Sequence, residues 1–336
     1  MLVLLAFGAF VIDYSALWIS RNQAQNAADA GALAGAAAIS FDGAVDKANR
    51  GRNVAWNMAH AQSVWGARPG VEPPISPYGG GIPLCEDRPD SCIRVDVHRD
   101  GSFGSASMPT FLANLFGQTS QPTRAMAVAQ TAPATGTACM KPWLIPDRWT
   151  DNKLPANAFD DPDDIYIAPT VNEDGVISYG TGWTPADIGT ELVLKPGNPS
   201  GAISPSDFFE IETATDYEES ISGCRITKSI GDMVDALPGS RVGPTASGVE
   251  ALLEANPNGA IVTIGMFNPH DFAIQDRQSG NFPLHIVNLL AFKIDHMTGG
   301  TVYGTIVGAP SSMLTVCNTP PCPTSTGLVS VIRLIR

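Results

Sequence analysis

The stretch VIDYSALWISRNQAQNAADAGALAGAAA, residues 11–38, decides the fold of the N-terminal part of this chain. It contains no proline, and alanine, the strongest helix former, makes up much of it. Gly31 and Gly35 are four residues apart, so they lie on one face of a helix. Asp42 and Gly43 predict a break, after which a second helix runs to about Trp65. We therefore expect an Ala-rich helical segment over residues 20–65, built for close packing.

Residues 1–12, MLVLLAFGAFVI, carry no charge and precede this stretch. As a helix, residues 1–19 are about 28 Å long, close to the thickness of a bilayer core. Asp13 lies toward the C-terminal end of that span, where a charge is tolerated more easily than at mid-bilayer. A cleaved signal peptide would need a basic flank and a cleavage site, and a buried core helix is the other alternative. We expect a transmembrane anchor over residues 1–19.

Together these residues resemble the N-terminus of TadE/TadG-like proteins of the Flp (Tad) pilus system. The matching positions are Asp13, Leu17, Trp18, Arg21, Gln25, Asn26, Ala27, Ala28, Asp29 and Ala30. The resemblance implies a non-enzymatic, pseudopilin-like assembly protein in the bacterial inner membrane, whose larger part lies in the periplasm or outside the cell. Its implied partners are pilins, other pilus-assembly membrane proteins or further copies of itself.

Helix packing is the mechanism that this resemblance implies. We expect the Ala- and Gly-rich helix to dock against sister helices, with Asp13, Arg21, Gly31 and Gly35 as the packing residues. We further expect Asp13 to pair with a basic group on a neighbouring molecule.

The resemblance extends to later segments. Residues 93–99 (IRVDVHR), 108–117 (MPTFLANLFG) and 124–132 (RAMAVAQTA) are similar to a strand–helix–strand segment of the family. Residues 139–149, 238–253 and 262–269 are similar to its larger members. We expect an apolar helix that ends at residues 114–116 and packs on strands 93–98 and 125–130.

Six cysteines, an even number, follow the expected anchor, which indicates disulfides in an oxidising compartment. They allow 15 pairings. The two close pairs suggest Cys85–Cys92 and Cys317–Cys322, which leaves Cys139–Cys224. A zinc site is disfavoured because no C-x-x-C pair is present and only His98 lies near a close pair.

The remaining pattern predicts an α+β protein. Residues 66–84 form a Pro/Gly-rich linker, residues 85–135 a small α/β, pilin-like unit, and residues 136–336 a β-rich, disulfide-bonded, extracytoplasmic domain. Strands are expected at residues 191–194, 261–267, 284–294, 301–307 and 328–334. Gly243 and Pro244 predict the start of one helix, with Ser247 and Glu250 at capping-box spacing.

The net charge of −13 disfavours nucleic-acid binding. Residues 141–220 hold 16 acidic and 4 basic side chains, so −12 of this charge lies there. The densest run contains Asp160, Asp161, Asp163 and Asp164, which are weak candidates for calcium ligands. Their spacing differs from that of an EF-hand loop, and a solvated acidic loop is the better interpretation.

No sequence motif indicates catalysis. The nucleophile elbow, the P-loop, the zincin motif and the dinucleotide fingerprint are all missing. His60, His98, His270, His285 and His296 are scattered, and the adjacent pairs His270–Asp271 and Asp295–His296 make poor dyads because neighbouring side chains diverge. We expect no enzyme and no cofactor. The alternatives are an anchored, adhesin-like surface binding module, which could depend on calcium, and an exported hydrolase.

Overall fold

The protein is described from a computed structural model, which places residues 2–41, 46–86, 88–151, 158–159, 164–171, 177–239, 241–274, 280–311 and 328–335. The chain forms two compact units. Unit 1 comprises Met1–Thr131 together with Ile332–Arg336, and unit 2 comprises Ala132–Val331. The sequence prediction assigned the last five residues to the β-rich domain, whereas here they belong to unit 1.

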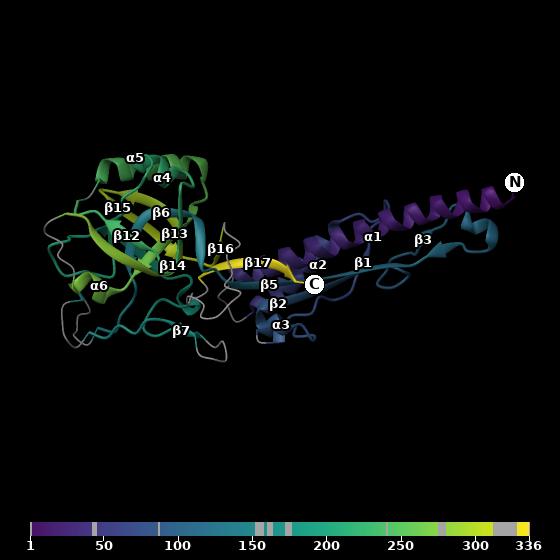
Figure 1. The fold of residues 1–336 in the computed structure, drawn as a ribbon, viewed down its shortest axis with the longest axis horizontal. Helices are drawn as coiled ribbons and strands as arrows, with labels where there is room; N and C mark the ends of the chain where they lie inside the picture. Colours follow the sequence, from purple (N-terminus) through teal and green to yellow (C-terminus); the bar gives the residue numbers. More distant parts are fainter. Residues whose placement is uncertain are drawn as a thin grey trace. The chain divides into compact units, whose positions relative to one another are not determined.

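Unit 1 is built on a helical hairpin. Helix α1 runs from Leu2 to Phe41 and helix α2 from Lys47 to Ala61, and Figure 1 shows them side by side against the sheet of this unit. Two helices were predicted here, and the break proposed at Asp42 and Gly43 lies outside the described residues. None of the helices in the described ranges combines the length and the hydrophobicity that a membrane span requires.

Small residues let the two helices approach closely. Every fourth residue of α1 from Ala24 to Ala36 is a fully buried alanine. A Cβ added at Gly31 would lie 2.8 Å from the Cβ of Ala59. A Cβ added at Gly35 would lie 2.8 Å from the Cβ of Ala55. Because both distances are shorter than real carbon contacts, only glycine fits at these two positions.

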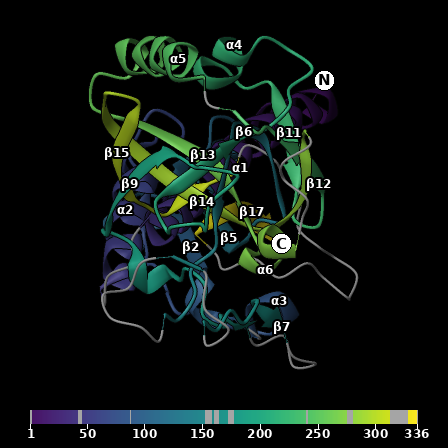
Figure 2. The ribbon, with the colours of Figure 1, turned by 90° about the vertical axis from the view of Figure 1, so that its left-hand side faces the viewer.

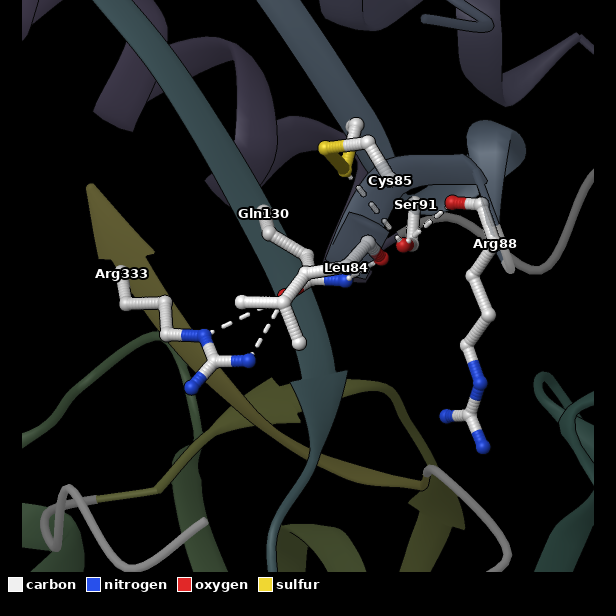
Figure 3. Close-up of a disulfide and its surroundings, with 7 residues drawn as sticks. Leu84, Cys85, Arg88, Ser91, Gln130 and Arg333 are labelled. Atoms are coloured by element: carbon white, nitrogen blue, oxygen red, sulfur yellow. Dashed lines mark hydrogen bonds between the residues drawn. A yellow bond between two sulfur atoms is a disulfide. The ribbon is translucent and has the colours of Figure 1, made fainter. Parts of the chain in front are cut away.

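The sheet of unit 1 contains β1 (Gly70–Val71), β2 (Cys92–Arg99), β5 (Thr123–Pro133) and the C-terminal β17 (Val329–Ile335), in that order, and the residues of β17 from Ile332 onward belong to this unit. Its inner face, with Ile93, Val95 and Val97, packs on the alanines of α1. In Figure 3 the Arg333 guanidinium donates to Oε1 of Gln130, at 3.2 Å from Nε and 3.0 Å from Nη2. The last strand of the chain is thus tied to β5.

Short elements connect these strands. They are α3 (Pro83–Glu86), the 3-10 helices η1 (Pro89–Ser91) and η2 (Ala113–Phe116), and the ladder of β3 (Met108–Pro109) with β4 (Ser120–Gln121). The helix predicted near residues 114–116 is therefore wrong in length and packing. Only one 3-10 turn forms, and none of its residues is buried. The sequence predicts that its hydrophobic side chains pack on strands, whereas Leu115 and Phe116 are exposed.

Unit 2 is organised around a mixed sheet of the order β10-β9-β15-β14-β13-β6-β11. The strands are β6 (Gly136–Pro146), β9 (Glu191–Pro196), β10 (Asp207–Glu210), β11 (Ile226–Ser229), β13 (Ala260–Phe267), β14 (Phe282–Thr298) and β15 (Thr301–Ile306), and β12 (Met233–Ala236) pairs with β14. The strands predicted over residues 191–194, 261–267, 284–294 and 301–307 are present, apart from their end residues.

Helices cover this sheet unevenly. Figure 2 shows α4 (Tyr217–Ser222) and α5 (Val242–Ala255) together on one side and α6 (Pro269–Ile274) on the other. Neighbouring residues of β14 alternate between the two cores, with Leu289 in one and Leu290 in the other. Helix α5 begins at Val242 after Arg241 at the N-cap, and no side chain caps it. The predicted start at Gly243 was therefore late, and Ser247 lies inside the helix.

The remaining short elements of unit 2 lie at its edges. They are the ladder of β7 (Thr170–Val171) with β8 (Ile177–Ser178), the 3-10 helix η3 (Pro185–Asp187) and β16 (Ala309–Pro310), which pairs with Val329 and Ser330.

Candidate interface on the N-terminal helix

The N-terminal half of α1 exposes large apolar side chains. Those of Phe7, Phe10, Val11, Ile12, Tyr14, Trp18 and Ile19 are all at least 46% exposed. The C-terminal half behaves differently, since its alanines and glycines are covered by α2 and the sheet. The two halves of this helix thus differ, since large apolar side chains are exposed on the first half and small residues are buried on the second.

Asp13 is the charged residue in this exposed half, and it is 5% exposed. Its carboxylate accepts hydrogen bonds from three consecutive backbone N–H groups. Oδ1 accepts from Phe111 at 2.7 Å, and Oδ2 accepts from Leu112 at 3.1 Å and from Ala113 at 2.5 Å. These are the donors that the start of η2 leaves without a helical partner.

The expected pairing of Asp13 with a basic group on a neighbouring molecule stays a prediction, and the structure shows the partners that the carboxylate has within the chain. Its partners are backbone groups of its own chain, which carry only partial charges. The carboxylate acts as a cap that comes from another helix.

Phe10, Asp13, Tyr14 and Leu17 of α1 face Ala113, Phe116 and Gln121 across a cavity of about 390 Å³. Apart from the Asp13 carboxylate, no ionisable carboxyl or amine lines it. The cavity therefore suits an apolar occupant and not an ionic ligand.

We call residues 110–117, with the sequence TFLANLFG, the apolar loop. Phe111, Leu115 and Phe116 are 52%, 79% and 72% exposed. The loop lies in the long connection between β2 and β5. Figure 1 shows this connection beside the N-terminal half of α1, around the label β3. Sequence reasoning treated these side chains as core, because an apolar run alone does not say on which side it will lie.

Charged residues lie at the two ends of this connection. Asp100, at the end of β2, forms an ion pair with Arg124, and its Oδ2 lies 3.3 Å from Nδ1 of His98. Burial of the carboxyl opposes ionisation, but hydrogen bonds from Ser102, Arg124 and His98 hold the pKa of Asp100 well below its usual range. The ion pair thus joins the end of β2 to the start of β5, and the residues between them, 101–123, are uncharged.

The other predicted packing residues occupy different positions. Arg21 is exposed on α1. Gly31 and Gly35 pack on α2 and β2 of the same chain, so the face they share is already occupied. Gln25 connects α1 to the sheet by donating to the Met126 carbonyl oxygen at 3.0 Å.

Cys85–Cys92 and Cys139–Cys224 are disulfide-bonded, with sequence separations of 7 and 85. Cys317 and Cys322 lie outside the described residues, as do the calcium candidates Asp160, Asp161 and Asp163. Asp164 is described and is buried. Over the placed residues, no three His, Cys, Asp or Glu side chains converge as metal ligands would.

Asp147 is among the buried carboxyls of unit 2, and its side chain is fully buried. Asp147 follows β6 and accepts hydrogen bonds from the backbone N–H of Arg148 (2.9 Å) and Trp183 (3.2 Å) and from the Tyr166 hydroxyl (3.1 Å). Burial raises the pKa of Asp147 to about 6, although these hydrogen bonds act in the opposite direction. With its oxygens engaged in this way, the carboxyl holds the loops after β6 together.

The histidine pairs do not converge on Asp147 as a catalytic set. Nδ1 of His285 lies 3.4 Å from Oδ2 of Asp271, whereas the His270 ring packs on Phe159 with centroids 4.9 Å apart. The His296 ring stacks on Tyr303. Each ring is engaged in a local contact.

Comparison with known proteins adds one match. A family model described as putative Flp pilus-assembly TadE/G-like matches residues 1–38, of which residues 2–38 lie in α1. The resemblance noted for residues beyond 38 lies outside this match. No curated protein and no solved structure matches the chain.

Proposed function

We propose that this chain, which carries a Tad domain of Flp pilus assembly at residues 1–38, is a membrane-anchored, non-enzymatic structural protein of the pilus-assembly apparatus. The match to the family model carries the proposal. It covers the α1 segment in which large apolar side chains are exposed. In this proposal, residues 1–19 are the anchor in the bacterial inner membrane.

The disulfides support an extracytoplasmic location for the rest of the chain. Cys85–Cys92 lies in unit 1 and Cys139–Cys224 in unit 2, so both units contain a cross-link of the kind that persists in oxidising compartments. We therefore assign both folded units to the periplasm or the cell exterior. There they would meet pilins, other assembly proteins or further copies of this chain.

The packing in unit 1 refines how α1 would act. Because Gly31 and Gly35 are covered by α2, the surface that α1 offers to a partner lies in its first half, around Phe10, Tyr14 and Trp18. The second half fixes that surface to the sheet. The proposed role is thus a rigid helix, held by its own domain, that presents an apolar end.

In-cell photo-crosslinking tests this function. A photoreactive residue is placed at Trp18, and at the exposed Asn57 of α2 as a matched control, in cells that assemble the pilus. From position 18 we expect crosslinked adducts with pilus-assembly proteins in the membrane fraction, and from position 57 we expect none. A deletion strain is expected to lose its pili. Normal piliation of that strain, with no adducts from either position, would refute the function.

A further inference from the structure

We propose that the apolar loop, residues 110–117, is a second membrane contact, which inserts Phe111, Leu115 and Phe116 into the lipid interface beside α1. The inference rests on the proposed anchoring of α1 and adds to it a lipid-binding site in a part of the chain distant in sequence. The occupant to which it commits is the lipid bilayer.

Charge is the first argument. Residues 101–123 contain no Asp, Glu, Lys, Arg or His, whereas the chain average of 16% charged residues would place about four there. The uncharged stretch is bounded by the Asp100–Arg124 ion pair. On α1, residues 2–20 contain one charged side chain, Asp13, and Arg21 follows them. The helix and the loop therefore share an uncharged region.

Exposure is the second argument. Leu115 and Phe116 are more than 70% exposed, and no element of unit 1 covers them. Soluble proteins rarely leave large apolar side chains together in this way, except where a partner or a membrane covers them. Tyr14 and Trp18 on the neighbouring face of α1 are also exposed, and these residue types favour the level of the lipid headgroups.

The backbone of the loop is the third argument. Irregular backbone can enter an apolar medium only if its polar groups are satisfied. The Asp13 carboxylate accepts from the N–H groups of residues 111–113. Thr110 donates to the Thr119 carbonyl oxygen, Leu115 to that of Leu112 and Gly117 to that of Asn114. The backbone N–H groups of residues 110–113, 115 and 117 thus have acceptors within the chain, which favours entry of the loop into a bilayer interface.

Asp13 is accordingly a positioning residue. It holds η2 against α1 at the level of Phe10 and Tyr14, so that the apolar side chains of both elements face the same medium. Because its oxygens accept three hydrogen bonds within the chain, its charge is screened from the lipid by backbone N–H groups.

The test uses the full chain reconstituted into vesicles of phosphatidylethanolamine and phosphatidylglycerol. An environment-sensitive fluorescent amino acid is incorporated at Leu115, at Phe10 on α1, or at Asn57 on α2, without touching the cysteines. Nitroxide-labelled lipids then report contact with the bilayer. We expect strong quenching and a blue-shifted emission at positions 10 and 115, and neither at position 57.

Other outcomes separate the two proposals. If the probe at position 10 is quenched but the probe at position 115 is quenched no more than the probe at position 57, the loop contact is overturned and the anchoring stands. Absence of quenching at both positions would refute the anchoring and the loop contact together. A blue shift at position 115 that grows with the protein-to-lipid ratio, without quenching, would mean that a second copy covers the loop, and would also overturn the proposal.

A second variant isolates the positioning role. In Asp13→Ala, we expect the probe at position 115 to lose its quenching while the probe at position 10 keeps it. Asp13→Asn, which retains one acceptor oxygen, is expected to recover part of the signal. Unchanged quenching at position 115 in Asp13→Ala would remove Asp13 from the proposal.

Discussion

Oδ2 of Asp13 accepts a hydrogen bond from the backbone nitrogen of Ala113 at 2.5 Å, across 100 residues of sequence. The same carboxylate also binds the N–H groups of Phe111 and Leu112. A residue in the segment that matches the Tad family thereby fixes the start of a 3-10 turn in a loop outside that match. The hydrogen bonds of Asp13 thus connect the segment that matches the family model to a loop outside that segment.

Removing this cap should loosen the loop. In Asp13→Ala, three N–H donors lose their acceptor, and we expect the free energy of unfolding of unit 1 to fall by about 1–3 kcal/mol. The amides of residues 111–113 should exchange faster with solvent deuterium, as measured by mass spectrometry of the detergent-solubilised chain. Asp13→Asn is the matched control and should lose less. Equal exchange in all three proteins would contradict the capping role.

Gly31 should not tolerate a side chain. In Gly31→Ala, the added Cβ meets the Ala59 Cβ at 2.8 Å and the Ala55 carbonyl oxygen at 2.9 Å. We expect this clash to exceed the gain of about 1 kcal/mol in helix propensity, with a net loss of about 1–3 kcal/mol in stability. Gly8→Ala is the control on the same helix, because nothing lies within 4 Å of its added Cβ. In thermal denaturation, we expect a lower Tm for Gly31→Ala and an unchanged Tm for Gly8→Ala.

The two disulfides should differ in their contribution to stability. Chain entropy predicts about 4.6 kcal/mol for Cys139–Cys224 and about 2.5 kcal/mol for Cys85–Cys92, because the first closes a much longer loop. We therefore expect the double variant Cys139→Ser/Cys224→Ser to lower the urea midpoint more than Cys85→Ser/Cys92→Ser does. The reverse order would show that native-state packing, and not loop closure, sets these contributions.

Asp147 should make the stability of unit 2 depend on pH. Because its pKa rises from 3.8 in the unfolded chain to about 6 in the fold, the folded state binds the proton more tightly. The favourable contribution is complete below about pH 4 and is lost as pH rises to about 6, a difference of about 3 kcal/mol.

The control for this pH dependence is Asp147→Asn, which cannot titrate. Urea unfolding of the full chain, followed by tryptophan fluorescence between pH 4 and pH 7, should show a smaller decline in stability for the variant. Parallel curves for the two proteins would place the titration at another group.

The family of the N-terminus could be identified from sequence because its signal is local. The residues from Asp13 to Ala30 carry the match in order, and an Ala-rich run without proline has one favoured conformation. Strand 93–98 was also predicted correctly, because alternation of apolar and polar residues reports a half-buried strand directly. The predicted helix at 108–117 failed because apolar character alone does not distinguish a core helix from an exposed loop.

Two non-local features of unit 1 could not be read from sequence. Strand β17 pairs with β5, and its residues from Ile332 onward belong to unit 1 although they follow unit 2 in the chain. Likewise, the partners of Asp13 lie about 100 residues away, and no local pattern indicates them. The sequence does show that residues 101–123 are uncharged, which is the one signal for the exposed loop. Only the tertiary structure shows that this loop lies beside α1.

The sequence by itself determined that α1 is a long helix of small residues with an apolar beginning, since helix propensity and hydrophobic character are properties of neighbouring residues. The tertiary structure decided which part of that helix is used within the chain. The helix face that contains Gly31 and Gly35 is covered by α2, and the close approach of the two backbones leaves no room there for another helix. Phe10, Tyr14 and Trp18 remain exposed, although the apolar loop, capped by Asp13, lies beside this part of the helix.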